Sequence, residues 1–229
     1  MGESEGIAER LAWARERIAA AAERAGRDPA GVKLMAVTKT IQAERVREAA
    51  ACGQMLFGEN RVQEAAEKIP AVGPGPKWHM IGRLQTNKAK AAVRLFDCVE
   101  SVDSVRLAEI LDRAARESGK VLPFFVEVNI GEEAQKSGAL PGDVERLLES
   151  TAGLASIRVT GLMAIPPYSP DPEDARPYFR RMHDLWDRLK GRGFRLDDLS
   201  MGMSGDFEVA VEEGATIVRL GTAIFGVRS

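Results

Sequence analysis

The sequence predicts an α/β fold, a single (β/α)8 TIM barrel. Three observations lead to this fold class. Short apolar runs alternate with segments of helical periodicity about eight times, the number that the barrel requires. The apolar runs are short, which suits parallel strands that are buried on both faces. The 229 residues also come close to the roughly 250 that such barrels use as one domain. An open doubly wound sheet is the alternative, because the number of units does not separate the two architectures.

A helix precedes the first strand. Its apolar residues recur every three or four positions and form one stripe: Ile7, Leu11, Ala14, Ile18 and Ala22. Gly26 is expected to end this helix, and Pro29 prevents its continuation. The barrel is therefore expected to carry an added N-terminal helix.

Strands and helices then alternate to the end of the chain. The predicted strands cover residues 34–37, 55–57, 78–81, 98–99, 122–130, 159–165, 199–201 and 216–220. The predicted helices between them cover residues 43–51, 61–68, 88–94, 103–119, 143–150, 177–190 and 207–213. Residues 73–76 form a Gly-Pro turn, and the sequence contains no linker or repeat. We therefore expect one domain over residues 1–229.

Composition excludes several classes of protein. The net charge is −2 with interspersed signs, so nothing global favours nucleic acid or acidic lipid as a partner. Cys52 and Cys98 lie far apart without a CxxC pair, which favours free thiols in a reducing compartment. Neither a signal peptide nor an apolar run of about 18 residues is present. We expect a cytoplasmic protein with no membrane partner, and the two unlinked histidines argue against a metal site.

Lys39 is the first candidate for chemistry, because it follows the first predicted strand directly. The carboxyl ends of barrel strands form the functional face. Burial there would lower the pKa of the lysine and leave an amine that can attack an aldehyde. Taken alone, however, the pattern favours a lysine that extends from a strand end into solvent.

The end of the chain carries a candidate phosphate site. Gly221 and Thr222 follow the last strand, where backbone N–H groups and the threonine hydroxyl can bind an anion. A simple glycine turn that closes the barrel is the alternative, and spacing does not choose between them. Ser204 follows the seventh strand and can donate to a phosphate or cap the next helix. Because these two strands are neighbours, Ser204 and Thr222 can face one pocket, which is a stronger indication than either motif.

Arg219 lies within the apolar run of the last strand and therefore needs a partner. The partner is either a carboxylate of the protein or a ring nitrogen or anion of a ligand. His79 lies in the third strand, and we interpret it as a hydrogen-bonded core histidine in preference to a catalytic acid. The G-x-S-x-G, Walker A and complete G-x-G-x-x-G signatures are absent.

Together these segments resemble the pyridoxal phosphate homeostasis proteins, also called proline synthetase co-transcribed homologues, an alanine-racemase-like family of small barrels. The resemblance extends along nearly the whole chain, and its combined motifs are highly specific. They are residues 36–40, 58–64, 78–88, 161–165, 200–204 and 219–226.

The resemblance implies pyridoxal phosphate (PLP) as the cofactor, bound covalently as an aldimine, or Schiff base, on Lys39. It implies Ser204, Gly221 and Thr222 as phosphate contacts and Arg219 as the residue that faces the pyridine nitrogen. It further implies that three residues line the ring pocket: Asn60, His79 and Met163.

The residues fit the chemistry of a racemase poorly. A guanidinium keeps its proton, so Arg219 would leave the ring nitrogen unprotonated and the ring a poor electron sink. A racemase also needs a second base, which the fold-related racemases take as a tyrosine from a second domain. This sequence ends at Ser229, soon after the last strand, and its only tyrosines are Tyr168 and Tyr178. We therefore expect no catalytic residue.

The resemblance implies a carrier or buffer of PLP in vitamin B6 and amino-acid homeostasis, and this is the expected function. PLP-dependent apo-enzymes are the candidate recipients, and a monomer or weak dimer is expected. A weak PLP-dependent racemase or decarboxylase is one alternative. A barrel that uses Lys39 for an aldolase-type Schiff base with sugar phosphates is another.

Overall fold

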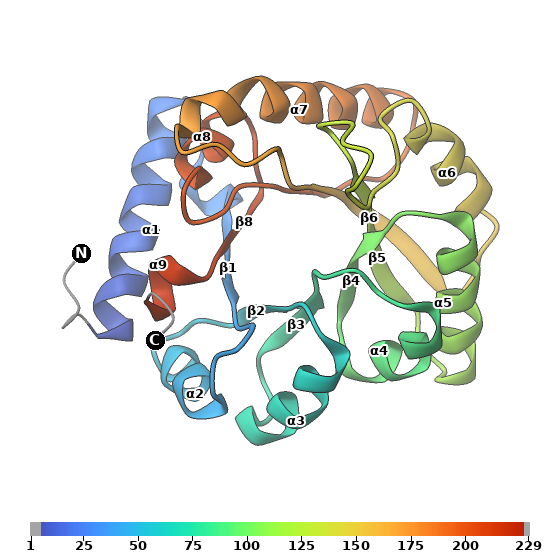
Figure 1. The fold of residues 1–229 in the computed structure, drawn as a ribbon, viewed down its shortest axis with the longest axis horizontal. Coiled ribbons are helices and arrows are strands. Elements are labelled where there is room, and N and C mark those ends of the chain that lie inside the picture. Colours follow the sequence, from blue (N-terminus) through green and yellow to red (C-terminus); the bar gives the residue numbers. More distant parts are fainter. Residues whose placement is uncertain (1–5, 227–229) are drawn as a thin grey trace.

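Eight parallel strands pair in chain order, and the last of them returns to pair with the first. The computed structural model describes residues 6–226. Figure 1 looks into the barrel, with the strands as an inner ring and the helices around it. The strands are β1 Lys33–Val37, β2 Leu56–Glu59, β3 Lys77–Met80, β4 Cys98–Val102, β5 Leu122–Val128, β6 Ile157–Ala164, β7 Asp198–Ser200 and β8 Ile217–Leu220. The closed barrel confirms the predicted fold class, and the open-sheet alternative is wrong.

Helices connect successive strands on the outside of the barrel. They are α2 Ala43–Ala51, α3 Val62–Val72, α4 Ala89–Leu95, α5 Val105–Glu117, α6 Val144–Thr151, α7 Arg176–Gly191 and α8 Phe207–Glu212. A short helix, α9 Thr222–Phe225, follows β8, and single turns of 3-10 helix occupy Pro29–Gly31, Thr86–Lys88 and Pro172–Ala175. Within residues 6–226, no helix is both long and apolar enough to cross a bilayer.

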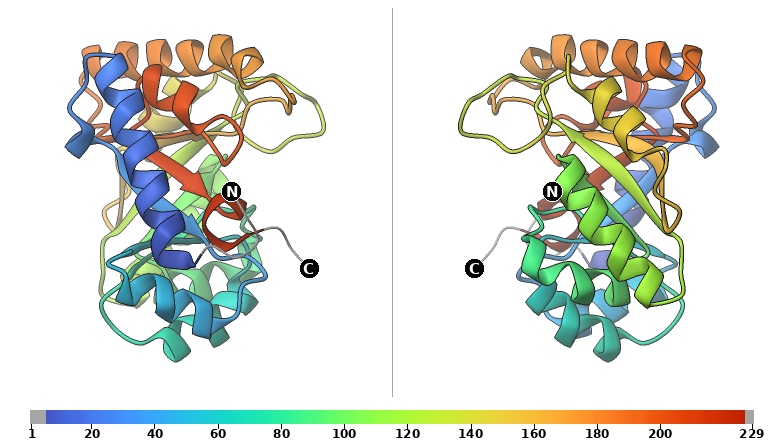
Figure 2. Two further views of the ribbon diagram at one scale, coloured as in Figure 1. Left: turned by 90° about the vertical axis from the view of Figure 1, so that its left-hand side faces the viewer. Right: turned by 90° about the vertical axis from the view of Figure 1, so that its right-hand side faces the viewer.

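The predicted N-terminal helix is present as α1, Ile7–Arg24. Its apolar stripe is buried, and it packs against α8 and α9 (Figures 1 and 2). Arg24 forms ion pairs with Glu208 and Glu212 across this contact. Gly26, at φ +68°, takes the left-handed conformation that follows many helix ends, as the sequence predicts.

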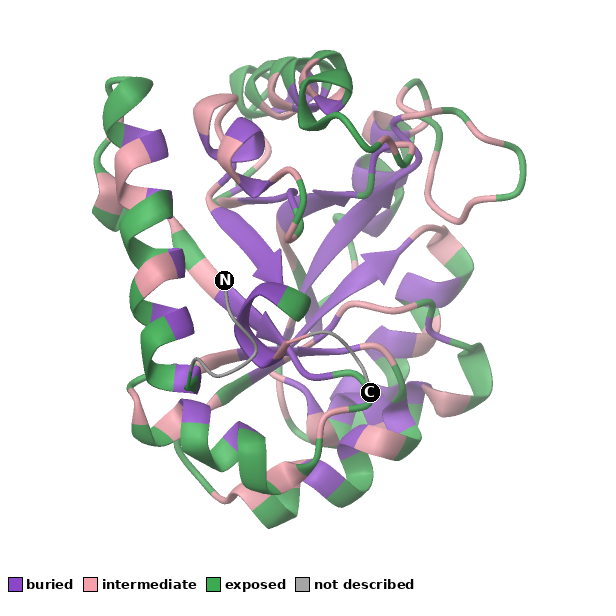
Figure 3. Ribbon diagram, turned by 60° about the vertical axis from the view of Figure 1, so that its left-hand side comes forward, coloured by how far each residue is buried: buried purple, intermediate pink, exposed green. Residues whose placement is uncertain are grey.

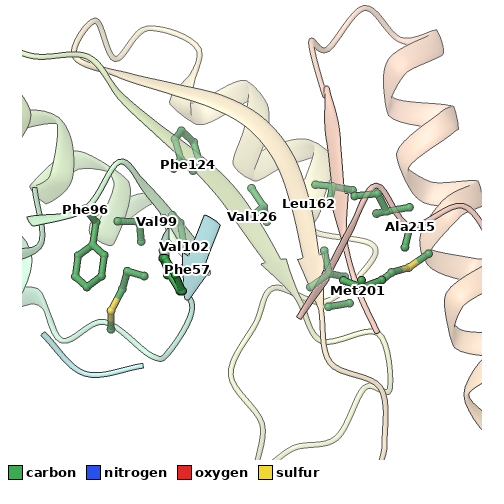
Figure 4. Close-up of a cluster of buried hydrophobic side chains, with 14 of the residues drawn as sticks. Phe57, Phe96, Val99, Val102, Phe124, Val126, Leu162, Met201 and Ala215 are labelled. Atoms are coloured by element: carbon green, nitrogen blue, oxygen red, sulfur yellow. The ribbon is translucent and has the colours of Figure 1, made fainter. Parts of the chain in front are cut away.

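Alternate residues of each strand face two different cores, because successive side chains of a strand point to opposite faces. The larger core lies between strands and helices, and Figure 4 shows part of it, including Phe57, Val99, Phe124 and Leu162. A smaller cluster inside the barrel comes from the other set of positions: Met35, Cys98, Phe125, Met163 and Ile217. Figure 3 shows the strands as buried and the outer helix faces as exposed.

Two elements differ from the sequence prediction in length. β4 extends to Val102, beyond the predicted 98–99, because its polar residues Glu100 and Ser101 are buried inside the fold and interrupt the apolar pattern. α3 continues through Pro70 to Val72. Pro70 has no backbone N–H, but so close to the helix end this removes only one helical hydrogen bond. Of the domain expected over residues 1–229, residues 1–5 and 227–229 lie outside the described residues.

Candidate functional site

A cavity of about 430 Å³ opens at the carboxyl mouth of the barrel, within the roughly 300–1,000 Å³ typical of small-molecule sites. It lies where β1, β2, β3, β6, β7 and β8 end. Six of the residues expected to contact the cofactor line this cavity: Lys39, Asn60, Ser204, Arg219, Gly221 and Thr222. The topology thus brings together residues from distant parts of the chain.

The cavity lining is positively charged. Among the described residues that line it, Lys39 and Arg219 are the cationic side chains, and none carries a carboxylate. A cavity lining with cations and without carboxylates attracts an anionic ligand. The remaining lining includes apolar side chains such as Val37, Ile81 and Ile165, which can cover the faces of a flat ring.

Lys39 follows β1 and shares the inward-facing set of positions with Met35 and Val37. The residue is exposed, so the expected desolvation of its amine by burial is wrong. The side chain is available at the mouth of the barrel because β1 ends two residues earlier. Its suitability therefore rests on accessibility within a cationic cavity.

Polar contacts that are buried before Lys39 and exposed after it fix the backbone on both sides of this residue. Lys68 Nζ donates to the carbonyl of Thr38 at 2.7 Å and to Glu59 Oε1 at 3.1 Å. The Thr38 hydroxyl also donates to Glu59, at 3.0 Å. The N–H of Thr40 donates to Glu64 Oε2 at 2.9 Å. Burial raises the pKa of Glu59, and the nearby Lys68 ammonium opposes this shift.

Sequence reasoning did not assign a role to these residues. Glu59 and Glu64 belong to residues 58–64, one of the segments on which the resemblance rests. Lys68 lies on the next helix and outside all of these segments. The four-residue spacing of Glu64 and Lys68 on α3 indicates an ion pair, and this pair forms at 3.4 Å. Only the fold shows that Lys68 and Glu64 contact the backbone of Thr38 and Thr40, the two neighbours of Lys39.

The candidate phosphate contacts converge from β7 and β8. The N–H groups of Gly221 and Ala223 lie 3.3 and 3.4 Å from Ser204 Oγ, to which they donate. The Ser204 hydroxyl and the start of α9 therefore occupy one corner of the cavity. Thr222 is exposed there, with its hydroxyl available to a ligand.

Asn60 lies between the cavity and a larger groove of about 1140 Å³ beside it, and both are also lined by Gly82. Its Oδ1 atom is buried and forms no hydrogen bond with any described residue. Such an atom is costly unless a ligand or water satisfies it. Gly82 permits this arrangement, because a Cβ atom there would lie 2.4 Å from the Asn60 carbonyl oxygen.

His79 and Met163, the other two residues expected at the ring pocket, are not among the described residues that line this cavity. Met163 is fully buried in the cluster inside the barrel. His79 bonds to Glu100 at 2.6 Å and lines a second cavity, of about 700 Å³, at the amino ends of the strands. Both residues point inward but lie deeper in the barrel than the ends of their strands.

The cavity contains no thiol or histidine among its described lining residues. Cys98 lies inside the barrel, where burial raises the pKa of its thiol well above the usual value. Across residues 6–226, no three His, Cys, Asp or Glu residues are arranged to hold a metal ion. The chemistry available at the cavity is therefore that of an amine, hydroxyls, amides and a guanidinium.

The fold and the lysine at its mouth define a class of protein. Residues 10–229 match the family model described as alanine racemase, N-terminal domain. A pyridoxal phosphate homeostasis protein of Aquifex aeolicus is 46% identical over 222 residues, covering 96% of this chain and 97% of the relative. One from Escherichia coli K12 is 41% identical over 228 residues, covering 97% of each chain. The chain belongs to the family of pyridoxal phosphate homeostasis proteins.

A solved structure supports the same relationship. PipY of Synechococcus elongatus, described with PLP bound, superposes with a TM-score of 0.84 and 39% identity. The match covers 96% of this chain and 100% of that one.

Proposed function

We propose that this protein holds PLP as a Schiff base on Lys39 and acts as a cytoplasmic carrier or buffer in PLP, vitamin B6 and amino-acid homeostasis. The observation that carries the proposal is the cationic cavity, which combines an accessible lysine with a corner of hydroxyl and N–H groups. We further propose that the chain folds as one domain and acts as a monomer or weak dimer. The proposed recipients of its PLP are PLP-dependent apo-enzymes.

The residues of the cavity fit the groups of PLP. Ser204, Gly221 and Thr222 would bind the phosphate, and Arg219 would face the ring nitrogen. Asn60, with its unsatisfied Oδ1, would lie beside the ring. The Lys39 amine would form a C=N bond with the aldehyde carbon, and the aldehyde oxygen would leave as water. Bound PLP supplies an electrophilic ring, whose ability to accept electrons depends on its nitrogen.

Two features support a carrier over a racemase. Arg219 is buried and remains charged, so it would donate to the ring nitrogen and leave it unprotonated. Tyr168 is 90% exposed, and neither it nor Tyr178 lines the cavity. The described lining thus offers no tyrosine as a second base opposite Lys39.

Absorption spectroscopy of the purified protein with added PLP tests the proposal. We expect a visible Schiff-base band, its loss in Lys39→Ala, and a modified peptide at Lys39 after borohydride reduction. Lys88→Ala is the control, because Lys88 lines the neighbouring groove and lies outside the cavity. An unchanged band in Lys39→Ala would refute the proposed attachment.

Incubation with single amino-acid enantiomers separates carrier from enzyme. The carrier should form no mirror-image amino acid. Turnover on the order of 1 per second or faster would identify an enzyme instead.

A further inference from the structure

A chain of polar side chains crosses the interior of the barrel. It contains Arg219 on β8, Ser200 on β7, Glu100 on β4 and His79 on β3. These positions share the inward set with Ile217, Cys98 and Phe125, which form the small interior cluster. The chain therefore runs from the candidate cofactor cavity, which Arg219 lines, to the cavity at the opposite mouth, which His79 lines.

The donors and acceptors of this chain have a defined order. Arg219 Nη1 donates to Ser200 Oγ at 2.7 Å, and the Ser200 hydroxyl donates to Glu100 Oε2 at 2.6 Å. Because arginine only donates, Ser200 accepts from Arg219 and has one hydrogen left for Glu100. His79 Nδ1 lies 2.6 Å from Glu100 Oε1 and donates to it if the carboxylate is ionised. Both carboxylate oxygens therefore have a partner.

The charged groups of this chain are buried, which costs free energy unless each of them is paired. Glu100 and Ser200 are fully buried, and Arg219 is 3% exposed. Burial lowers the pKa of Arg219, and the carboxylates of Glu100, Asp206 and Glu127 oppose the shift. A buried guanidinium and a buried carboxylate are tolerated only when each is paired and hydrogen-bonded. Among the described residues, Glu100 is the one of these three carboxylates that hydrogen bonds link to Arg219, by way of Ser200.

Arg219 is also fixed from a second side. Its Nη2 donates to the carbonyl of Ala164, at the end of β6, at 2.9 Å. A guanidinium has five N–H donors in a planar fork. Ser200 and Ala164 thus accept from two of these donors. Arg219 also lines the cavity, and none of the described residues accepts a hydrogen bond from its remaining N–H groups.

We propose that Glu100, acting through Ser200, is the positioning residue that fixes the Arg219 guanidinium toward the ring nitrogen of PLP. This proposal rests on the proposed function, because it assigns the ligand atom that Arg219 meets. Glu100 itself is not among the described residues that line the cavity, so its effect on a ligand there would be indirect. Its role is to hold the charge and the orientation of the group that does.

The test compares variants that break the chain at different points. Ser200→Ala removes the hydroxyl that connects Arg219 to Glu100 but keeps the charges of both residues. Glu100→Gln keeps the shape of the side chain but removes its negative charge. Arg219→Met is the reference for loss of the contact with the ring. Glu127→Gln is the matched control: Glu127 is a buried carboxyl on β5 that acts on Arg219 through its charge, while its own hydrogen bond comes from Ser137.

Two measurements are made on each variant. The first is the ¹⁵N chemical shift of PLP labelled at the ring nitrogen, which reports the hydrogen bond from Arg219 directly. The second is the Kd of PLP from absorption titration. Thermal unfolding without ligand shows whether each variant remains folded. If Glu100→Gln does not fold, Ser200→Ala still provides the test.

We expect Ser200→Ala and Glu100→Gln to move the ¹⁵N resonance in the same direction as Arg219→Met. We expect the Kd to rise about tenfold, as for the loss of a hydrogen bond to a charged group. Glu127→Gln should retain the wild-type resonance and Kd. A wild-type ¹⁵N shift in folded Ser200→Ala, or an equal change in Glu127→Gln, overturns the positioning role. Failure of the wild-type protein to bind PLP refutes the proposed function instead.

Discussion

The backbone N–H of Thr40 donates a 2.9 Å hydrogen bond to the carboxylate of Glu64, immediately after Lys39 in the chain. Thr40 has φ +65°, a left-handed conformation that a β-branched residue adopts only at a cost. Glu64 lies on α3, and its pKa is lowered although burial opposes this, because the Thr40 N–H and Lys68 donate to it. One carboxylate therefore stabilises the turn that presents the candidate cofactor lysine.

Glu64→Ala should destabilise this turn, because it removes the acceptor that holds Thr40 in its left-handed conformation. We expect slower Schiff-base formation at Lys39, followed by stopped-flow absorption after addition of PLP. We also expect a loss of about 1–3 kcal/mol in the free energy of unfolding, measured by urea titration. The double variant Glu64→Ala with Thr40→Gly should recover part of both, because glycine adopts positive φ without strain. No recovery in the double variant would show that the strain at Thr40 is unimportant.

Removal of Lys68 should destabilise the protein strongly. Lys68→Met leaves Glu59, which is fully buried, without its cationic partner. We expect a loss of about 3–5 kcal/mol in the free energy of unfolding, the usual cost of an uncompensated buried charge. Lys77→Met is the control, because Lys77 is 67% exposed in its ion pair with Asp97, and exposed pairs contribute less than about 1 kcal/mol. Equal losses in the two variants would contradict the assignment of Lys68 as the buried partner.

The sequence predicted the barrel because periodicity and strand count depend on local patterns. The sequence predicts that Lys39, Ser204 and Thr222 lie at one mouth of the barrel, because they follow apolar runs and strand ends form one face of a barrel. Glu100 and Lys68 were missed because a charged residue inside a strand or on a helix is usually solvent-exposed. Their roles depend on partners 100 residues away for Glu100 with Ser200, and 30 residues away for Lys68 with Thr38. The depth of His79 and Met163 in the barrel likewise depends on how the strands close, which a single strand does not specify.

The contact between α7 and α8 should depend on pH. Arg176 donates to Glu212 at 2.8 Å and to Glu213 at 2.6 Å. Burial tends to raise the pKa of both carboxyls, but these hydrogen bonds, with others from Arg24 and Arg180, lower it overall. A lowered pKa contributes stability that is present above the ordinary value of 4.5 and is lost as the pH falls through the folded value.

Arg176→Met should therefore destabilise the protein at pH 7, by about 1–3 kcal/mol for hydrogen bonds to charged groups. The difference from wild type should begin to shrink as the pH falls below about 4.5, the ordinary carboxyl value. It should shrink further as the pH falls through the lowered pKa values of Glu212 and Glu213 in the wild-type protein. Urea unfolding of both proteins at several pH values measures this difference in the free energy of unfolding. Arg146→Met, which removes an exposed pair with Asp143, should show little change at any of these pH values. A difference that stays constant down to pH 3 would argue against this electrostatic contribution.

Ser204 and Thr222 supply the hydroxyls at the proposed phosphate corner, and their replacement should weaken retention of PLP without preventing attachment at Lys39. Each lost charge-assisted hydrogen bond should cost roughly 1.5–3 kcal/mol, so the double variant Ser204→Ala with Thr222→Ala should lose PLP on dialysis much faster than wild type. Borohydride reduction before dialysis should still trap PLP at Lys39, because the amine is unchanged. Ser150→Ala is the control, since its hydroxyl only donates to the Arg146 carbonyl on α6. Retention equal to wild type in the double variant would place the phosphate elsewhere in the cavity, away from the start of α9.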